Sequence, residues 1–550
     1  GSEMCIRDRY YADAGDFSAA GAARIELLDA LPTAIAELTV GHYDYQRGLL
    51  AGSTDTGAGT LLGAVDAQFS DGPWDLPENS NRYTGLLRYG QGDARNGWHL
   101  TGMGYGNEWN STDQIPQRAV SSGALSRFGV LDDSNGGRTH RYSLSGSWQA
   151  SAAQHDTRIS AYAIDYGLNL FSNFTFLLDD PDRGDQFEQE DRRQVYGGQV
   201  QRNWFGTLGR FYTQHTLGLQ LRFDDISSVG LFHTQAQRRL GTTRQDAVRQ
   251  LSVSPYLENQ TQWLPKLRTT LGLRGDFYHF DVDADNALNS GVAQDGLASP
   301  KVSVILGPWL DTEYYLSAGY GFHSNDARGT TIRVDPVSGD PTARVDALVR
   351  ATGTEVGVRS ARLAGLQTTL SAFLLDIDSE LLFIGDAGNT EASRPSRRYG
   401  LEWTNYYTPL TWLSFDADFS FSRANFKDDD PAGRSIPGAV ERVIALGATV
   451  HEWNGYFGSV RLRHFGPRAL IENDSVRSSA TTLVNAEAGY AFHSGVRLAL
   501  TAFNLFDAED SDIDYFYASR LSGEAADGVE DRHFHPVEPA QLRLTVTLSF

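Results

Sequence analysis

Hydrophobic and polar residues alternate with a period of two in many segments of the chain. The final segment, QLRLTVTLSF at 541–550, places leucine, valine and phenylalanine on one face and arginine, threonine and serine on the other. Segment 413–421, LSFDADFSF, repeats the pattern and sets Asp416 and Asp418 opposite phenylalanines. Segments 142–149 and 484–490 alternate in the same way. Alternation of this kind predicts β-strands with one apolar and one polar face.

From about Thr33 onward, strands of this kind are separated alternately by short turns and longer polar connections. Short turns are expected near 55–57, 92–94, 151–153, 206–210, 263–264, 307–310, 361–362, 409–410, 451–452 and 492–493. Connections are expected near 42–43, 71–80, 108–137, 167–192, 225–245, 282–296, 322–351, 376–394, 425–437, 466–478 and 506–539. Ten turns and eleven connections predict twenty-two strands. Short turns at one rim and long loops at the other are typical of outer-membrane β-barrels.

Composition favours a membrane barrel over the alternatives. The mean hydropathy of -0.37 is too polar for a helical membrane protein, and no run of about 18 apolar residues is long enough for a spanning helix. A barrel strand turns only every second residue to lipid, so a polar average is compatible with it. A soluble β-sandwich also alternates, but it has shorter strands. We therefore predict an all-β transmembrane antiparallel barrel of about 22 strands.

Charge and motifs exclude several function classes. The net charge of -22 argues against nucleic acid as a partner, since phosphate binding needs a clustered cationic surface. Cys5 is the single cysteine, so the chain has neither a disulfide framework nor a thiolate metal site. Nucleophile-elbow, P-loop and zinc-protease motifs are absent from the sequence. We expect no enzyme activity and no cofactor.

The N-terminal residues depart from the strand pattern. Residues 1–9, GSEMCIRDR, lack the apolar core of a signal peptide, and the character of the sequence changes at Tyr10. We expect 1–9 to be a non-native scar. Residues 10–32 are rich in small side chains, and we expect them to be the end of another domain. Residues 33–550 are expected to form the barrel.

Several passages resemble the TonB-dependent receptor family of outer-membrane transporters. YYADAGDFSAAGAARI, from Tyr10, resembles the end of the plug domain that sits inside the barrel in that family. GYGFHSNDARG at 319–329, SRRYGLEW at 396–403 and AFNLFDAED at 502–510 resemble passages of its barrels. The terminal Phe550 matches the signal by which such barrels are recognised for insertion. The resemblance covers nearly the whole chain.

The resemblance implies TonB-coupled uptake of a scarce ligand across the bacterial outer membrane, and the expected ligand is a ferric siderophore or another metal chelate. It implies a monomer in outer-membrane lipid and a residual plug segment at 10–32. The energy-coupling contact would lie in an N-terminal region missing from this sequence. Two other functions stay open, namely a passive porin-like channel and an adhesin or structural barrel without a transported ligand. A soluble all-β enzyme is a more distant alternative.

Three groups of loop residues are candidates for ligand binding. The first is His323, Asn325, Asp326 and Arg328, at the start of the 322–351 connection. These polar groups would also serve as a hydrogen-bonded belt that fixes the loop to the wall, and this structural role is favoured.

The second group is Arg394, Arg397 and Arg398, a cationic cluster in an acidic chain. Guanidinium groups suit capture of carboxylate or phosphate, so an anionic chelate is a candidate ligand. Pairing with acidic residues of the wall or plug is an equal alternative.

The third group lies in the 506–539 connection and comprises Tyr515, Tyr517, Arg520, His533 and His535. His533 and His535 with Glu538 would offer metal ligands, but packing against the aromatic side chains is the favoured interpretation, and no metal site is assigned. Acidic runs at 179–191 and 427–431 lack EF-hand spacing and are expected to be solvated.

Overall fold

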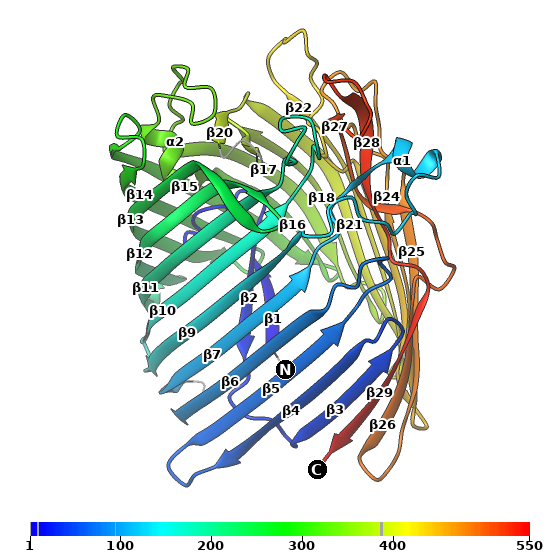
Figure 1. The fold of residues 1–550 in the computed structure, drawn as a ribbon. Helices are drawn as coiled ribbons and strands as arrows, with labels where there is room; N and C mark the ends of the chain where they lie inside the picture. Colours follow the sequence, from blue (N-terminus) through cyan, green and yellow to red (C-terminus); the bar gives the residue numbers. More distant parts are fainter. Residues whose placement is uncertain (1, 8–9, 94, 385–388) are drawn as a thin grey trace.

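The computed structural model describes residues 2–7, 10–93, 95–384 and 389–550, and their main feature is a closed antiparallel barrel (Figure 1). Within this described part, 22 strands form the barrel, which confirms the predicted strand count. The last strand, β29 (Gln541–Ser549), pairs with the first barrel strand, β3 (Ile35–Gly41), and sets Thr545 opposite Thr39. This pairing closes the sheet.

Between β3 and β29 each barrel strand pairs with the next barrel strand in the chain. These strands are β4 (Gln46–Asp55), β5 (Thr60–Ser70), β6 (Ser80–Gly92), β7 (Asn96–Asn110), β9 (Gly136–Ser151), β10 (His155–Ser172), β11 (Phe187–Leu208), β12 (Phe211–Gln235), β13 (Arg238–Leu264), β14 (Leu267–Ala284), β15 (Gly291–Trp309), β16 (Thr312–Ser324), β17 (Leu348–Ser360), β18 (Leu366–Ile377), β21 (Ser396–Leu410), β22 (Leu413–Phe426), β23 (Arg442–Trp453), β24 (Tyr456–Phe465), β25 (Thr481–Ala491) and β26 (Val496–Phe503).

Shorter elements lie outside the barrel ladder. They are β1 (Ser2–Arg7), β2 (Ala22–Leu27), β8 (Ile115–Pro116), α1 (Gln117–Ser121), α2 (Ala327–Thr331), β19 (Leu381–Ile384), β20 (Asn389–Ala392), β27 (Ser511–Ser519) and β28 (Val529–Pro536). β1 pairs with β2, and β8, β28 and β27 form a sheet above one side of the rim (Figure 1). Residues 1, 8 and 9 of the expected scar lie outside the described residues, and the assignment of 1–9 as non-native stays a prediction.

The alternation in the sequence separates the outer wall from the lumen. On β14, Leu273 and Phe277 are exposed on the outer face, with 51% and 58% of their surface accessible. Arg274, Asp276 and Tyr278 are buried on the inner face of the same strand. The strands therefore place an apolar surface toward lipid and a polar one toward the interior, as a membrane barrel requires. No helix among the described residues is long and apolar enough to cross a membrane.

The predicted turns are confirmed within a few residues, but two predicted loops are wrong in part. Residue 94 of the turn predicted near 92–94 and residues 385–388 of the connection predicted near 376–394 lie outside the described residues. β11 begins at Phe187, inside the loop expected at 167–192, and β12 and β13 extend through the loop expected at 225–245. The ladder continues to the pair Gln235–Arg238. Both faces of these extensions carry polar residues, so the period of two is lost although the backbone pairing persists. The connecting residues Ala236 and Gln237 have φ of 49° and 60°, a tight turn without the Asn-Gly signal.

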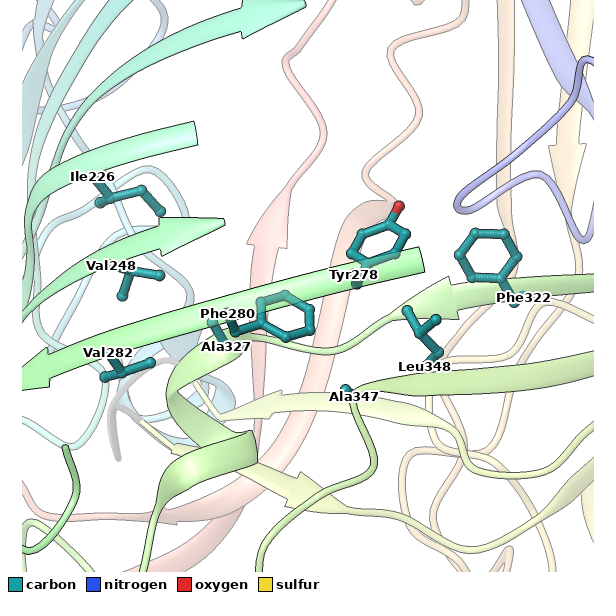
Figure 2. Close-up of a cluster of buried hydrophobic side chains, with 9 residues drawn as sticks. All are labelled: Ile226, Val248, Tyr278, Phe280, Val282, Phe322, Ala327, Ala347 and Leu348. Atoms are coloured by element: carbon teal, nitrogen blue, oxygen red, sulfur yellow. The ribbon is translucent and has the colours of Figure 1, made fainter. Parts of the chain in front are cut away.

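An apolar cluster packs on the inner wall near the long-loop rim (Figure 2). Phe280 of β14 is fully buried and lies beside Ala327 of α2, while Phe322 at the end of β16 is 1% exposed. Residues from β12, β13 and the start of β17 complete the cluster. Burial of a side chain such as Phe contributes about 1.5–3 kcal/mol. The cluster therefore folds the β16–β17 connection inward against the wall.

The two faces of β14 predict opposite responses to a new charge. Leu273→Arg would place a guanidinium in the hydrocarbon region and should destabilise the barrel by about 2–4 kcal/mol. Thr270→Arg, on the inner face of the same strand, should change stability far less. Urea unfolding of each variant from lipid vesicles measures the difference, and equal losses would contradict the assignment of the two faces.

Candidate functional site

Residues 10–21, named here the lumen segment, are held against the inner wall of β13–β16. The backbone N–H of Ala12, a fully buried residue, donates to Glu258 Oε2 at 3.0 Å. Lys301 Nζ donates to the carbonyl oxygens of Tyr11 and Ala14, both at 2.9 Å. In these contacts the wall binds the main chain of the segment.

A second set of contacts joins the lumen segment to the end of β16. The Asp16 carboxylate accepts from the backbone N–H of Ser324 at 2.7 Å and from the Tyr278 hydroxyl at 3.3 Å. The N–H of Phe17 donates to the carbonyl oxygen of Phe322 at 3.1 Å. Burial raises the pKa of the Asp16 carboxyl, although the hydrogen bonds from Ser324 oppose this shift. The segment is thus linked to the point where the β16–β17 connection begins.

The first predicted group of ligand residues is brought together beside this contact. The Phe17 and His323 rings lie 5.8 Å apart, and Asn325 Nδ2 donates to the Asp346 carbonyl at 2.7 Å. Arg328 is buried and pairs with Asp326 at 2.7 Å. Burial acts to raise the pKa of the Asp326 carboxyl, but the Arg328 guanidinium outweighs it and holds that pKa at about 2. These contacts fix the loop to the wall, and ligand contact by the group stays a prediction.

The second predicted group is not gathered into one cluster. Arg394 pairs with Asp428 and Glu472, at 2.8 Å and 2.7 Å. Arg397 pairs with Asp376 at 2.7 Å. Each of these guanidinium groups already has a carboxylate partner from a neighbouring strand or connection.

Arg398 pairs with Glu380, with Nη2 at 3.1 Å from Oε2. Because Arg397 and Arg398 are consecutive on β21, their side chains point to opposite faces of the wall. A single ligand therefore does not contact both in this arrangement.

The third predicted group lies around the sheet of β27, β28 and β8. Tyr517 stacks on His533, with ring centroids 3.8 Å apart, and His533 Nε2 lies 2.7 Å from Ser519 Oγ. Burial lowers the pKa of His533 to about 4, so its ring is neutral at physiological pH. The ring therefore serves as packing in this arrangement.

The other members of the third group lie apart from that stack. His535 Nδ1 is 2.9 Å from Asp512 Oδ1, and Arg520 Nη1 donates to the Leu177 carbonyl at 3.4 Å. Tyr515 is half exposed. In the part of the chain that the structure describes, no group of three His, Cys, Asp or Glu side chains is placed to hold a metal ion.

Side chains that the sequence did not single out meet on the inner face of β9–β12. Arg141, Tyr166 and Arg193 lie directly opposite one another on β9, β10 and β11. Tyr162 and Arg222 lie in a second row across β10–β12. Strand pairing alone brings them together. We call this surface the luminal arginine–tyrosine face, and it consists of Arg141, Tyr162, Tyr166, Arg193 and Arg222.

The orientation of this face follows from its neighbours. Gln220 Nε2 donates to the Asp13 carbonyl of the lumen segment at 3.1 Å, so β12 turns its even-numbered residues inward. Arg222 belongs to that set. Gly197 lies between Tyr162 and Arg222, and a Cβ there would collide with the Tyr162 ring. The glycine therefore leaves room for the phenol to lie along the wall.

The face carries more positive than negative charge. Arg222 Nε pairs with Asp224 at 2.7 Å, and Arg193 pairs with Asp191. Arg141 is exposed and has no ion pair with any residue that the structure describes. Guanidinium and phenol groups donate hydrogen bonds to anionic oxygens. The arrangement is suited to an anionic, oxygen-rich ligand above the lumen segment.

Connections at the long-loop rim meet at Asp113. Its Oδ2 accepts from the backbone N–H of Asn173 at 3.1 Å and from Asn135 Nδ2 at 2.9 Å. Gln186 Nε2 also donates to Asn135 Oδ1, at 3.1 Å. The connections after β7 and β10 are joined in this way. Burial raises the pKa of the Asp113 carboxyl to about 6.

A family model and solved structures both match this chain. A family model described as TonB dependent receptor-like, beta-barrel, matches residues 67–505. The structure is similar to the unliganded ferric citrate transporter FecA, with a TM-score of 0.79, 13% identity, and coverage of 98% of this chain and 82% of that chain. A search of curated proteins gives no match.

Two further solved structures have the same fold. The closed form of the ferric-catecholate import receptor Fiu from K12 E. coli has a TM-score of 0.73 and 14% identity, covering 98% of this chain and 85% of that chain. The copper transporter OprC has a TM-score of 0.74 and 16% identity, covering 100% of this chain and 85% of that chain. At these identities the likeness shows the fold alone.

Asp113 predicts a pH-dependent loop junction. Because its pKa in the folded protein is about 6, above the ordinary 3.8, the junction loses stability as the pH rises through this interval. Hydrogen-exchange protection factors over 173–186 should therefore be higher at about pH 5 than at about pH 7.5. Asp113→Asn, which mimics the protonated carboxyl, should remove most of the difference. A parallel pH response in the two proteins would assign the effect to another group.

Proposed function

The chain belongs to the family of TonB-dependent receptor β-barrels, and on this premise we propose that it imports a ferric siderophore or another metal chelate across the outer membrane. Its place is the bacterial outer membrane, where barrels of this family lie. The family consists of receptors and transporters, and we propose no enzyme activity for this member. The proposed ligand is anionic and rich in oxygen.

The luminal arginine–tyrosine face is the observation that carries the ligand class. It sets Arg141, Arg193 and Arg222 with two phenols on the inner wall of a chain whose net charge is -22. Chelators that bind iron through carboxylate or phenolate oxygens present the acceptors that these groups require. The structural neighbours include a ferric citrate transporter and a ferric-catecholate import receptor, which supports the same class.

Energised transport is the second part of the proposal. The lumen segment lies across the inner wall and is held by Lys301, Glu258 and Ser324, which argues against a freely open porin-like channel. We assign residues 10–32 to the end of a plug domain. Transport would be energised through contact with TonB, and the receptor would act as a monomer.

The loop residues predicted from the sequence keep a proposed role at the outer rim. His323, Asn325, Asp326 and Arg328 would hold the β16–β17 connection in place while ligand enters. The arginines of the second group and the aromatic residues of the third would tie neighbouring loops together, and Tyr515 would remain accessible to ligand. An adhesin or structural barrel would have no need of a charged face inside the lumen.

Removal of the luminal charges should weaken chelate binding. A hydrogen bond to a charged group contributes about 1.5–3 kcal/mol, so Arg141→Gln and Arg222→Gln should each raise the Kd roughly 10- to 100-fold. Ferric citrate and a ferric tris-catecholate are suitable probes, with binding to the detergent-purified protein followed by calorimetry. The change should appear for whichever chelate binds.

Arg158→Gln is the matched control for these two variants. Arg158 is an exposed arginine on β10 near the turn rim, four residues before Tyr162 on the same face. Its substitution should leave the Kd unchanged. Equal weakening by all three variants would indicate a general charge effect, and binding of no chelate, cobalamin or sugar would favour the adhesin alternative.

A further inference from the structure

We propose that the outer wall of the barrel binds a phosphorylated lipid of the outer leaflet at one defined place on β18–β24. The surface has a hollow of about 740 Å³ there, near the long-loop ends of these strands. We call it the outer hollow. The residues that line it include Ala372, Tyr399, Leu401, Phe421, Arg423 and Arg442. The site is separate from the lumen and from the proposed import function.

The register of the strands gives the hollow an apolar floor and two arginines nearer the rim. Leu401 lies opposite Phe421, and Ala372 lies opposite Leu401, which gives an apolar floor on the lipid-facing side. Arg442 lies opposite Phe421, and Arg423 lies opposite Tyr399. Because β22 ends at Phe426 and β23 begins at Arg442, both arginines lie at the long-loop rim of the wall.

The apolar floor is exposed in the manner of a lipid contact. Tyr399, Leu401 and Phe421 have 46%, 52% and 46% of their surface accessible. They continue the apolar outer face formed by the same strands below. An acyl chain that enters the hollow therefore stays within the hydrocarbon layer along its whole length.

The cations above the floor lack protein partners. Arg423 and Arg442 are exposed, and neither forms an ion pair or a side-chain hydrogen bond with any residue in the described ranges. The acidic lining residue Glu441 is already paired with Arg477 at 2.8 Å. Two unpaired guanidinium groups that line one hollow of an acidic protein therefore favour an external anion.

A second pair of cations extends the positive surface. Arg397 and Lys427 both contact Asp376, at 2.7 Å and 3.5 Å, so two positive charges share one carboxylate. Arg397 lies on the same face of β21 as Tyr399, two residues closer to the rim. Guanidinium groups bind phosphate through paired N–H donors. Basic pockets at the membrane surface that bind anionic head groups use the same chemistry.

The combination of an apolar floor with arginines above it identifies the occupant. Free phosphate would use the arginines but not the apolar floor, whereas a neutral acyl chain would use the floor but not the arginines. A phosphorylated, acylated lipid of the outer leaflet would place its phosphate at the arginines near the rim and an acyl chain on the apolar floor below them. We therefore assign the outer hollow to the phosphate and one acyl chain of such a lipid.

Titration of the detergent-purified full chain with bisphosphorylated lipid A, followed by native mass spectrometry, tests the assignment. The parent protein should retain one lipid at concentrations where the double variant Arg423→Gln/Arg442→Gln retains at least about tenfold less. The Arg249→Gln variant should bind like the parent, because Arg249 is an exposed outer-wall arginine of β13, far along the wall from the outer hollow, beside Asp225 of β12. Heat-modifiable migration on gels verifies that each variant is folded.

Two further probes separate the lipid from its parts. Dephosphorylated lipid A should bind the parent protein at least about tenfold more weakly, and inorganic phosphate should fail to displace bound lipid A. Equal retention by the parent and the double variant would overturn the proposal. So would equal loss in the Arg249→Gln variant, or displacement by inorganic phosphate at comparable concentrations, which would indicate an anion site without a lipid.

Discussion

The pairing of β29 with β3 is the interaction on which the rest of the structure depends. Backbone N–H and C=O groups in hydrocarbon have no water to bind, so each unpaired group costs several kcal/mol. The register from Arg543–Gly41 to Ser549–Ile35 removes the two edges that an open sheet would expose. In the closed sheet, alternate residues of each strand face lipid and the residues between them face the lumen, which is why the sequence alternates with a period of two.

That division explains why the candidate sites differ in character. The inner faces of β9–β16 contain charged and hydrogen-bonding side chains, which hold the lumen segment and form the luminal arginine–tyrosine face. The outer faces are apolar over most of their height, and at the rim of β21–β23 they carry arginines that are unpaired among the described residues. Inner polarity supports passage of a polar ligand, while the change of polarity on the outer wall follows the boundary between hydrocarbon and head groups.

The sequence predicts the barrel well and its sites only in part. Alternation in segments such as 541–550 is local information, so the strands, their number and the closing pair follow from it. The extensions of β12 and β13 are missed because polar residues stand on both of their faces, so the alternation of apolar and polar positions is lost. Arg141, Tyr166 and Arg193 are separated by more than twenty residues along the chain, and only register makes them neighbours. Clusters close in sequence, such as Arg397 and Arg398, instead diverge to opposite faces.

The hydrogen bonds between the wall and the lumen segment have a consequence for substitutions in the wall. Lys301 binds the carbonyl oxygens of Tyr11 and Ala14, Arg274 approaches those of Ala12 and Asp13, and Gln220 binds that of Asp13 as well. Carbonyl oxygens are common to all amino acids. These contacts are made to the main chain of residues 11–14, and replacement of Lys301 would remove two of them at once. A substitution at one position of the wall is therefore expected to affect several consecutive residues of the segment.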